Sequence, residues 1–187
     1  YLRGMLAAKH GDAAASSAAY REAAGLIDSI SPGALAGNEP MLMAGALSHR
    51  ALGNVSKSRE YLETLVARNG RHFTAQGMLA AIYVDTKDFG RALPLLEGLQ
   101  RVSPDDPHTL FLLGTVQMAR KRYALASELF EKAAARSGSV DAIRELGFSQ
   151  LGQGQDKTGI ANIEKAFASN NSDARAGVQL AMIYMKQ

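Results

Sequence analysis

The sequence predicts an all-α protein built as a solenoid of antiparallel helix pairs, with about five repeats and a final half-repeat. Ala supplies 32 of the 187 residues, aromatic residues make up 6%, and Trp is absent, a composition that favours closely packed helices over sheets. Pairs of small residues twelve positions apart recur along the chain at steps of 42, 34, 34, 33 and 34 residues. A large apolar residue follows each complete pair after one helical turn.

The small-residue pairs indicate close contact between two helices. Antiparallel helices approach closely only where a small side chain on each leaves room for the neighbouring backbone. Gly, Ala or Ser occupies all eleven positions, which are Gly4 and Ser16, Ala46 and Ser58, Ala80 and Ala92, Gly114 and Ala126, Gly147 and Gly159, and Ala181 at the start of a sixth unit. The large residues one turn later are expected to fill the space beside the small ones; they are Tyr20, Leu62, Leu96, Phe130 and Ile163.

This spacing divides a single domain, residues 1–187, into units. They are expected near residues 1–30, 39–72, 73–106, 107–139 and 140–173, with a half-unit at 174–187 and a connector at 31–38 that holds the eight extra residues of the longest step. First helices are expected near 1–10, 40–52, 73–86, 107–119, 140–152 and 174–186. Second helices are expected near 12–29, 55–69, 88–101, 121–136 and 156–168.

Local signals mark several helix ends. The Asp-Asp-Pro segment 105–107 predicts a helix start, with an Asp cap and Pro in the first turn. Ser139 and the segment 171–173 can cap the following helices in the same way. Pro94 falls inside a second helix, which it should bend without ending, because Leu96 continues the apolar stripe beyond it.

Composition excludes several classes of protein. The net charge of +3 is too small to require a nucleic-acid partner, and the absence of Cys excludes disulfide scaffolds, thiol catalysis and Cys-based zinc sites. No apolar run is long enough to predict a transmembrane segment. The chain begins at Tyr1 without Met or a signal peptide, so we expect it to be a piece of a longer protein.

Motifs for chemistry are weak throughout. The four His residues are scattered, and no His-Glu-x-x-His motif occurs, so we expect no metal site. The segment 152–159 resembles a phosphate-binding loop only faintly, since it lacks the Gly before Lys157 and joins two helices. The basic run 120–123 is the best nucleic-acid candidate, but no second run extends it, so a solvated turn is favoured. We therefore expect no enzyme activity, no cofactor and no nucleic-acid partner.

The repeat resembles the tetratricopeptide repeat family over nearly the whole chain. The clearest unit carries Leu110, Leu113 and Gly114 in the first helix, and Ala126 followed by Phe130 in the second. The family's Trp is missing throughout and its Pro is present only once, and the unit from residue 39 is degenerate, with Gly45 and His49 in the Leu and Tyr positions. The resemblance implies a right-handed superhelix whose concave face binds proteins.

A narrower resemblance is to the tetratricopeptide lipoproteins of bacterial PEP-CTERM/exosortase systems. It rests on the segments Ala-Leu-Pro-Leu-Leu-Glu at 92–97, Phe-Glu-Lys-Ala at 130–133 and Ile-Glu-Lys-Ala at 163–166. It implies a periplasmic or outer-membrane-associated protein, lipid-anchored upstream of this segment, that serves export of polysaccharide or sorted proteins. A cytoplasmic location remains the alternative.

In the family, the first helix of each unit lines the concave face. Carried onto this chain, the partner-binding positions are Met43, Leu47, Arg50, Ala81, Val84, Phe111, Thr115, Met118, Arg144, Phe148 and Leu151. With Met5, Met182 and Met185, which fall on the same face of the first and last helices, five of the seven Met residues lie on the expected concave face, and Met suits surfaces that adapt to varied apolar partners. The hypothesis is an interaction scaffold that takes an apolar peptide or amphipathic helix, with Arg50 and Arg144 contacting acidic groups at its edge.

Alternatives stay open at this point. The same residues can simply pack between neighbouring units, and the chain can be an accessory subunit of an enzyme complex or, less favoured, an RNA-binding helical repeat. The final half-unit is expected to present Leu180, Ala181 and Tyr184 to the preceding pair and to leave its far side apolar. Apolar ends predict end-to-end self-association.

Overall fold

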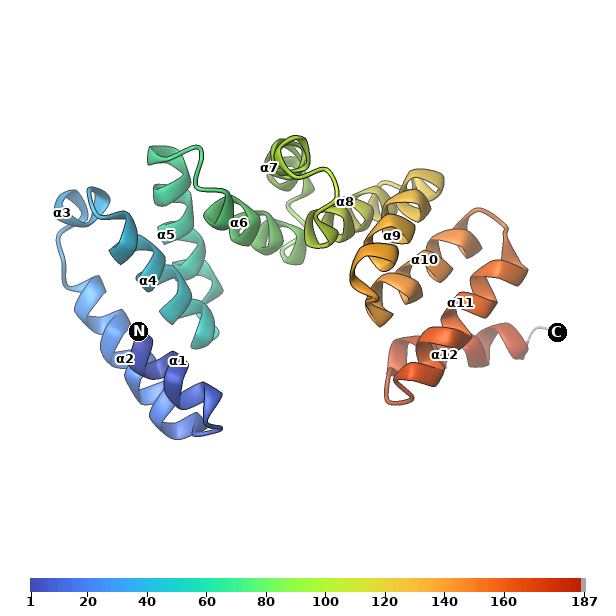
Figure 1. Cartoon of the computed structure of the whole chain (residues 1–187), viewed down its shortest axis with the longest axis horizontal. Helices are drawn as coiled ribbons and strands as arrows, with labels where there is room; N and C mark the ends of the chain where they lie inside the picture. The colour runs from blue at the N-terminus through green and yellow to red at the C-terminus, as the bar shows by residue number, and fades with distance from the viewer. Residues whose placement is uncertain (186–187) are drawn as a thin grey trace. The chain divides into compact units, whose positions relative to one another are not determined.

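The computed structural model describes residues 1–185 and is all-α, with twelve helices in that part of the chain (Figure 1). The all-α prediction is therefore confirmed. The chain forms two compact units, Tyr1–Ile82 and Tyr83–Gln187.

The first unit contains two helix pairs and a short helix between them. The helices are α1 (Leu2–Lys9), α2 (Ala13–Asp28), α3 (Pro32–Ala36), α4 (Glu39–Ala51) and α5 (Val55–Arg68), followed by the first ten residues of α6 (Phe73–Asp85). Helix α2 packs against α1 and α4, and α4 packs against α5. The connector predicted at 31–38 is thus not a plain loop, because α3 occupies most of it and buries Leu35.

The second unit is a series of neighbouring helices, each packed against the next (Figure 1). After the end of α6 come α7 (Phe89–Val102), α8 (Pro107–Ala119), α9 (Tyr123–Ser137), α10 (Val140–Gly152), α11 (Asp156–Ser169) and α12 (Ala174–Tyr184). Every helix predicted from the repeat spacing is present within one or two residues of its expected start, and residue 186, predicted as the last helical residue, lies outside the described part.

Side-chain caps begin the helices where the sequence predicts them. The carboxylate of Asp106 accepts a hydrogen bond from the backbone N–H of Thr109, with Pro107 in the first turn of α8. Ser139 caps α10 and Asp173 caps α12. Helix α7 continues through Pro94, and Leu96 beyond it is fully buried, so the prediction that Pro94 does not end the helix is confirmed.

The small residues Gly114 and Gly147 are points of close helix contact, as predicted. A Cβ atom added to Gly114 would lie 2.7 Å from the Phe130 ring, far inside ordinary contact distance. One added to Gly147 would lie 2.8 Å from the carbonyl oxygen of Gly159 on the neighbouring helix. In these two helix pairs the small and large residues predicted to form the interface therefore do meet.

The last half-unit differs from the prediction at one position. Leu180 is buried, and the Tyr184 hydroxyl donates a hydrogen bond to Glu164 of α11, as expected for a helix that faces the preceding pair. Ala181 is exposed, in contrast to the expectation, because the equivalent residues of complete units pack against a second helix and none follows α12 in residues 1–185. The far side of α12 exposes Val178 and Met182, so it is apolar as expected, and end-to-end association stays a prediction.

The turn inside each helix pair places one residue in the left-handed backbone region. These residues recur with the repeat; they are Gly11, Gly53, Lys87, Lys121 and Gly154. Gly adopts this conformation without a steric penalty, whereas Lys87 and Lys121 hold it at φ 61° and 58°. The sequence pattern did not reveal this shared conformation, because Lys gives no sign of it.

Candidate partner-binding surface

In the first unit, three predicted binding residues lie along one face of α4. Met43 and Leu47 are half-buried and Arg50 is exposed, and their spacing of four and three residues places them one turn apart on the same side of the helix. Within residues 1–185 no side chain forms an ion pair with Arg50, so its charge is available at the end of this face. Ala81 on α6 is buried and is not accessible to a partner.

Met43 and Leu47 line an open cavity of about 290 Å³. Its other lining residues are Tyr1, Glu39, Pro40, Ala44 and His72, and we name it the Met43 pocket. Two of its polar neighbours are already engaged, and the first is Glu39, whose carboxylate accepts hydrogen bonds from the Asn69 amide at 3.1 and 3.2 Å. His72 Nδ1 likewise accepts from the backbone N–H of Ala75 at 3.2 Å. The pocket therefore presents mainly apolar surface.

In the second unit, the predicted residues on α8 belong partly to the core. Phe111 and Met118 are half-buried and pack against a cluster of Ala126, Phe130 and Leu146. The rings of Phe111 and Phe130 meet edge to face, with centroids 5.5 Å apart. These α8 side chains thus help to hold the helix pairs together and leave only part of their surface exposed.

The remaining predicted residues of the second unit are similarly placed. Thr115 is half-buried, and its hydroxyl donates to the carbonyl of Phe111 in the preceding turn at 3.0 Å. Phe148 and Leu151 of α10 are half-buried against Ile163, Ala176 and Leu180. Val84 near the end of α6 is buried and is not accessible to a partner.

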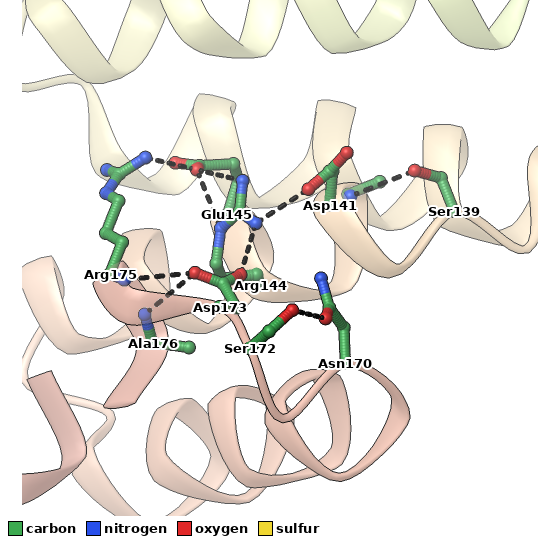
Figure 2. Close-up of polar contacts among 10 residues, drawn as sticks. Ser139, Asp141, Arg144, Glu145, Asn170, Ser172, Asp173, Arg175 and Ala176 are labelled. Atoms are coloured by element: carbon green, nitrogen blue, oxygen red, sulfur yellow. Dashed lines mark hydrogen bonds and ion pairs between the residues drawn. The ribbon is translucent and has the colours of Figure 1, made fainter. Parts of the chain in front are cut away.

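Arg144, predicted to contact an acidic partner, instead forms ion pairs inside the second unit. Figure 2 shows its guanidinium between three carboxylates, with Nη1 at 2.6 Å from Asp141 and 2.5 Å from Asp173, and Nη2 at 3.2 Å from Glu145. Arg175 of α12 reaches Glu145 from the other side, at 2.5 Å. The Arg144 side chain is only 15% exposed, and its charge is neutralised by carboxylates of its own chain.

This cluster fastens α12 to α10. Burial alone would lower the pKa of Arg144, but the hydrogen bond to Asp173 and the charge of Glu145 raise it. The pKa of Asp173 is lowered by the backbone N–H of Ala176 and by Arg144. The guanidinium of Arg175 also lies over the Phe148 ring, 4.5 Å from its centre, and so covers part of that ring.

A second polar cluster, in the first unit, was not predicted from the sequence. His49 is buried, and its Nε2 lies 3.1 Å from Oδ1 of Asp28, to which the Tyr61 hydroxyl also donates a hydrogen bond. Because a carboxylate only accepts, His49 donates from Nε2, and its ring stacks on that of Tyr61 with centroids 5.6 Å apart. His49 in place of the family's Tyr was the sequence signal that this unit is unusual.

The electrostatics of this cluster favour an ionised carboxylate. Burial alone would raise the pKa of Asp28, but the hydrogen bonds from Tyr61 and His49 outweigh it and lower the pKa below its ordinary value. Burial and the hydrogen bond to Asp28 raise the pKa of Tyr61 well above its usual range. At neutral pH Asp28 is therefore an ionised carboxylate that accepts hydrogen bonds from His49 and Tyr61.

Among residues 1–185, His, Asp and Glu side chains nowhere gather in a group of three or more that could hold a metal ion. Over the same residues, no helix has the length and apolar character needed to cross a membrane.

Comparison with known proteins agrees with this architecture. The tetratricopeptide repeat profile matches residues 43–107 and again residues 78–141, which together span 99 of the 187 residues. No curated protein sequence matches the chain.

Solved structures share the fold at low sequence identity. MamA from Desulfovibrio magneticus RS-1 is similar with a TM-score of 0.69 and 18% identity, covering 91% of this chain and 93% of its own. TTC0263, a thermophilic TPR protein from Thermus thermophilus, gives a TM-score of 0.67 and 20% identity, covering 97% of this chain and 95% of its own. The chain belongs to the tetratricopeptide repeat family, whose helix pairs form scaffolds for protein–protein interaction.

Proposed function

We propose that this chain is a non-enzymatic scaffold that binds an apolar peptide or amphipathic helix of a partner protein, with the Met43 pocket as the anchor site. The observation that carries the proposal is the pocket itself, where Met43 and Leu47 line an open, mainly apolar space and the polar groups of Glu39 and His72 are already hydrogen-bonded. A cavity of about 290 Å³ lies at the lower limit of ligand sites, about 300–1,000 Å³, so it suits a small apolar group such as a side chain better than a large cofactor.

The face of α4 supplies two kinds of contact. Burying one large apolar side chain in the pocket contributes about 2 kcal/mol, and Met43 can adjust its shape to different side chains. Arg50, one turn beyond Leu47 and exposed, can pair with an acidic group of the same partner segment. Arg144 contributes no such contact, because its three carboxylate partners belong to its own chain.

Binding can be tested with peptides selected from a displayed library against the whole chain. We expect the selected peptides to carry apolar residues at helical spacing with an acidic residue beside them, and Met43→Gln to weaken their binding by about tenfold or more. Met41→Gln is the matched control, because Met41 is exposed on the same helix and does not line the pocket. Equal weakening by the two substitutions, or none by Met43→Gln, would contradict the proposal.

For the cellular role, we propose a place in a bacterial envelope system that exports polysaccharide or sorted proteins. The support is the likeness of segments 92–97, 130–133 and 163–166 to the PEP-CTERM/exosortase lipoproteins. The full protein would then lie in the periplasm, attached to the membrane by lipid. Fractionation of the cells that make it, with mass spectrometry of its N-terminal peptide, tests this role, and an unlipidated cytoplasmic protein would refute it.

A further inference from the structure

The first unit contains a second cavity, of about 320 Å³, that shares no residue with the Met43 pocket. One wall is apolar and comes from Ile30, Leu35 of α3 and Leu42 of α4. Its polar lining residues include Asp28 and Tyr61. We name this cavity the Asp28 pocket. It depends on the long connector, because three of its lining residues, Pro32, Leu35 and Ala36, lie in the segment 31–38 that the regular repeat step does not contain.

Asp28 occupies an electrostatically unfavourable place. It is the last residue of α2, where the helix dipole disfavours a negative charge by about 0.3–1 kcal/mol. The hydrogen bonds from His49 and Tyr61 offset this cost, and both are made to Oδ1. Oδ2 receives no hydrogen bond from residues 1–185, and the side chain is 38% exposed. An acidic residue at the C-terminal end of a helix, kept there by compensating hydrogen bonds, is typical of a functional position.

The other charges of the pocket compensate each other. Lys57 and Glu60 of α5 form an ion pair of 3.3 Å across one turn, so their charges cancel locally. Among the residues that line the pocket, the Asp28 carboxylate then leaves one negative charge uncompensated, beside apolar side chains. This combination matches a cationic N–H donor on an apolar chain and disfavours an anion.

We propose that the Asp28 pocket binds a primary ammonium group carried on a short aliphatic chain. The ammonium donates to Oδ2 of Asp28, and the aliphatic chain lies against Leu35 and Leu42. His49 and Tyr61 act as positioning residues, because they hold the carboxylate in one orientation before the ligand arrives. A cavity near the lower limit of ligand sites, about 300–1,000 Å³, suits a small amine or one lysine side chain. This inference does not depend on the proposed peptide binding.

The first test compares three probes with the same six-carbon chain: n-hexylammonium, n-hexanol and hexanoate. Each is titrated into the whole chain and followed by amide NMR signals, and we expect hexylammonium to shift the signals of Leu35 and Tyr61. Hexylammonium should bind about tenfold more tightly than hexanol, since only the charged donor engages the carboxylate, and hexanoate should bind more weakly still. Equal binding of the three probes would overturn the proposal.

The second test removes the charge. Asp28→Asn should weaken hexylammonium binding about tenfold or more and leave hexanol binding unchanged. Glu22→Gln is the matched control, because it removes a carboxylate from the same helix that pairs with Arg3 outside the pocket. Tight hexylammonium binding by folded Asp28→Asn would refute the proposal. If that variant does not fold, the comparison of probes on the unaltered chain still decides.

The source of the amine can be distinguished with the same assay. An acetylated Leu-Lys-Leu amide presents the lysine ammonium as a partner protein would, whereas hexylammonium represents a free aliphatic amine. Tighter binding of the peptide places the ammonium on a protein partner, and tighter binding of hexylammonium places it on a small molecule. Either result supports the pocket as an amine site. If neither probe binds, the proposal is contradicted.

Discussion

Replacing Gly147 by Ala should force α10 and α11 apart. The added Cβ would lie 2.7 Å from Cγ1 of Ile163 and 2.8 Å from the carbonyl oxygen of Gly159, both on α11. A side chain such as Ile163 can rotate away, but the backbone oxygen of Gly159 moves only if the whole helix moves. The substitution therefore acts on the spacing of the two helices rather than on one rotamer.

The expected magnitude follows from two opposing terms. Overpacking of this kind costs about 1–3 kcal/mol, and the backbone clash places Gly147→Ala near the upper value. Ala in place of Gly in a helix interior stabilises the helix by about 1 kcal/mol, through its higher helix propensity. The net loss is about 2 kcal/mol, which corresponds to a fall in Tm of about 4–8 °C for a chain of this size.

Thermal unfolding followed by circular dichroism measures this effect. Gly98→Ala is the matched control, because Gly98 lies inside α7 of the same unit and its added Cβ would have only Arg101 Nη2 nearby, at 4.0 Å. We expect the control to raise Tm slightly, by the helix-propensity term alone. The interpretation of the small-residue positions would be refuted if Gly147→Ala unfolded at the same temperature as Gly98→Ala.

Three further predictions concern single positions. Ala126→Leu should lower Tm, because Ala126 is fully buried and overpacking costs about 1–3 kcal/mol; an unchanged Tm would show the helix register to be wrong. Lys121→Gly should raise stability in urea unfolding by about 1 kcal/mol, since it removes a side chain held at φ 58°, and a loss of stability would contradict this. Folding lowers the pKa of Asp173, so its ionised carboxylate stabilises the folded chain above the pKa that Asp has in the unfolded chain, about 3.9, and this stabilisation is lost as pH falls through the pKa in the folded chain. The Tm of Asp173→Asn should therefore fall less steeply below pH 4 than the Tm of the unaltered chain.

The helix pairs were predictable because their signals are local and repeated. Asp106 and Pro107 predict the start of α8. Gly114 predicts a large residue packed against it at a fixed distance along the chain, and this residue is Phe130. Helix α3 was not predictable in this way. Its segment is rich in Pro, Gly and Ala, and what makes it helical is the burial of Leu35 in the tertiary structure.

The candidate site was predictable only in part, because contacts between repeats depend on pairs far apart in sequence. The face of α4 follows from helical spacing, so Met43 and Leu47 were correctly placed together. The role of Arg144 could not be predicted from the sequence, since one of its partners is Asp173, 29 residues away in the next half-unit. Charge alone could not distinguish an arginine that awaits a partner from one that is already paired.

The departures from the repeat pattern have a common structural consequence. Gly45 replaces the large apolar residue expected in the first helix of its unit, and a Cβ there would lie 3.2 Å from Ile27 and from the Tyr61 ring. The absence of that side chain gives the Tyr61 ring its place against α4, from which its hydroxyl reaches Asp28. His49, in place of the usual Tyr, donates to the same carboxylate. Two residues that weaken the repeat as a sequence pattern thus hold the Asp28 carboxylate in place, at the pocket where we propose an amine site.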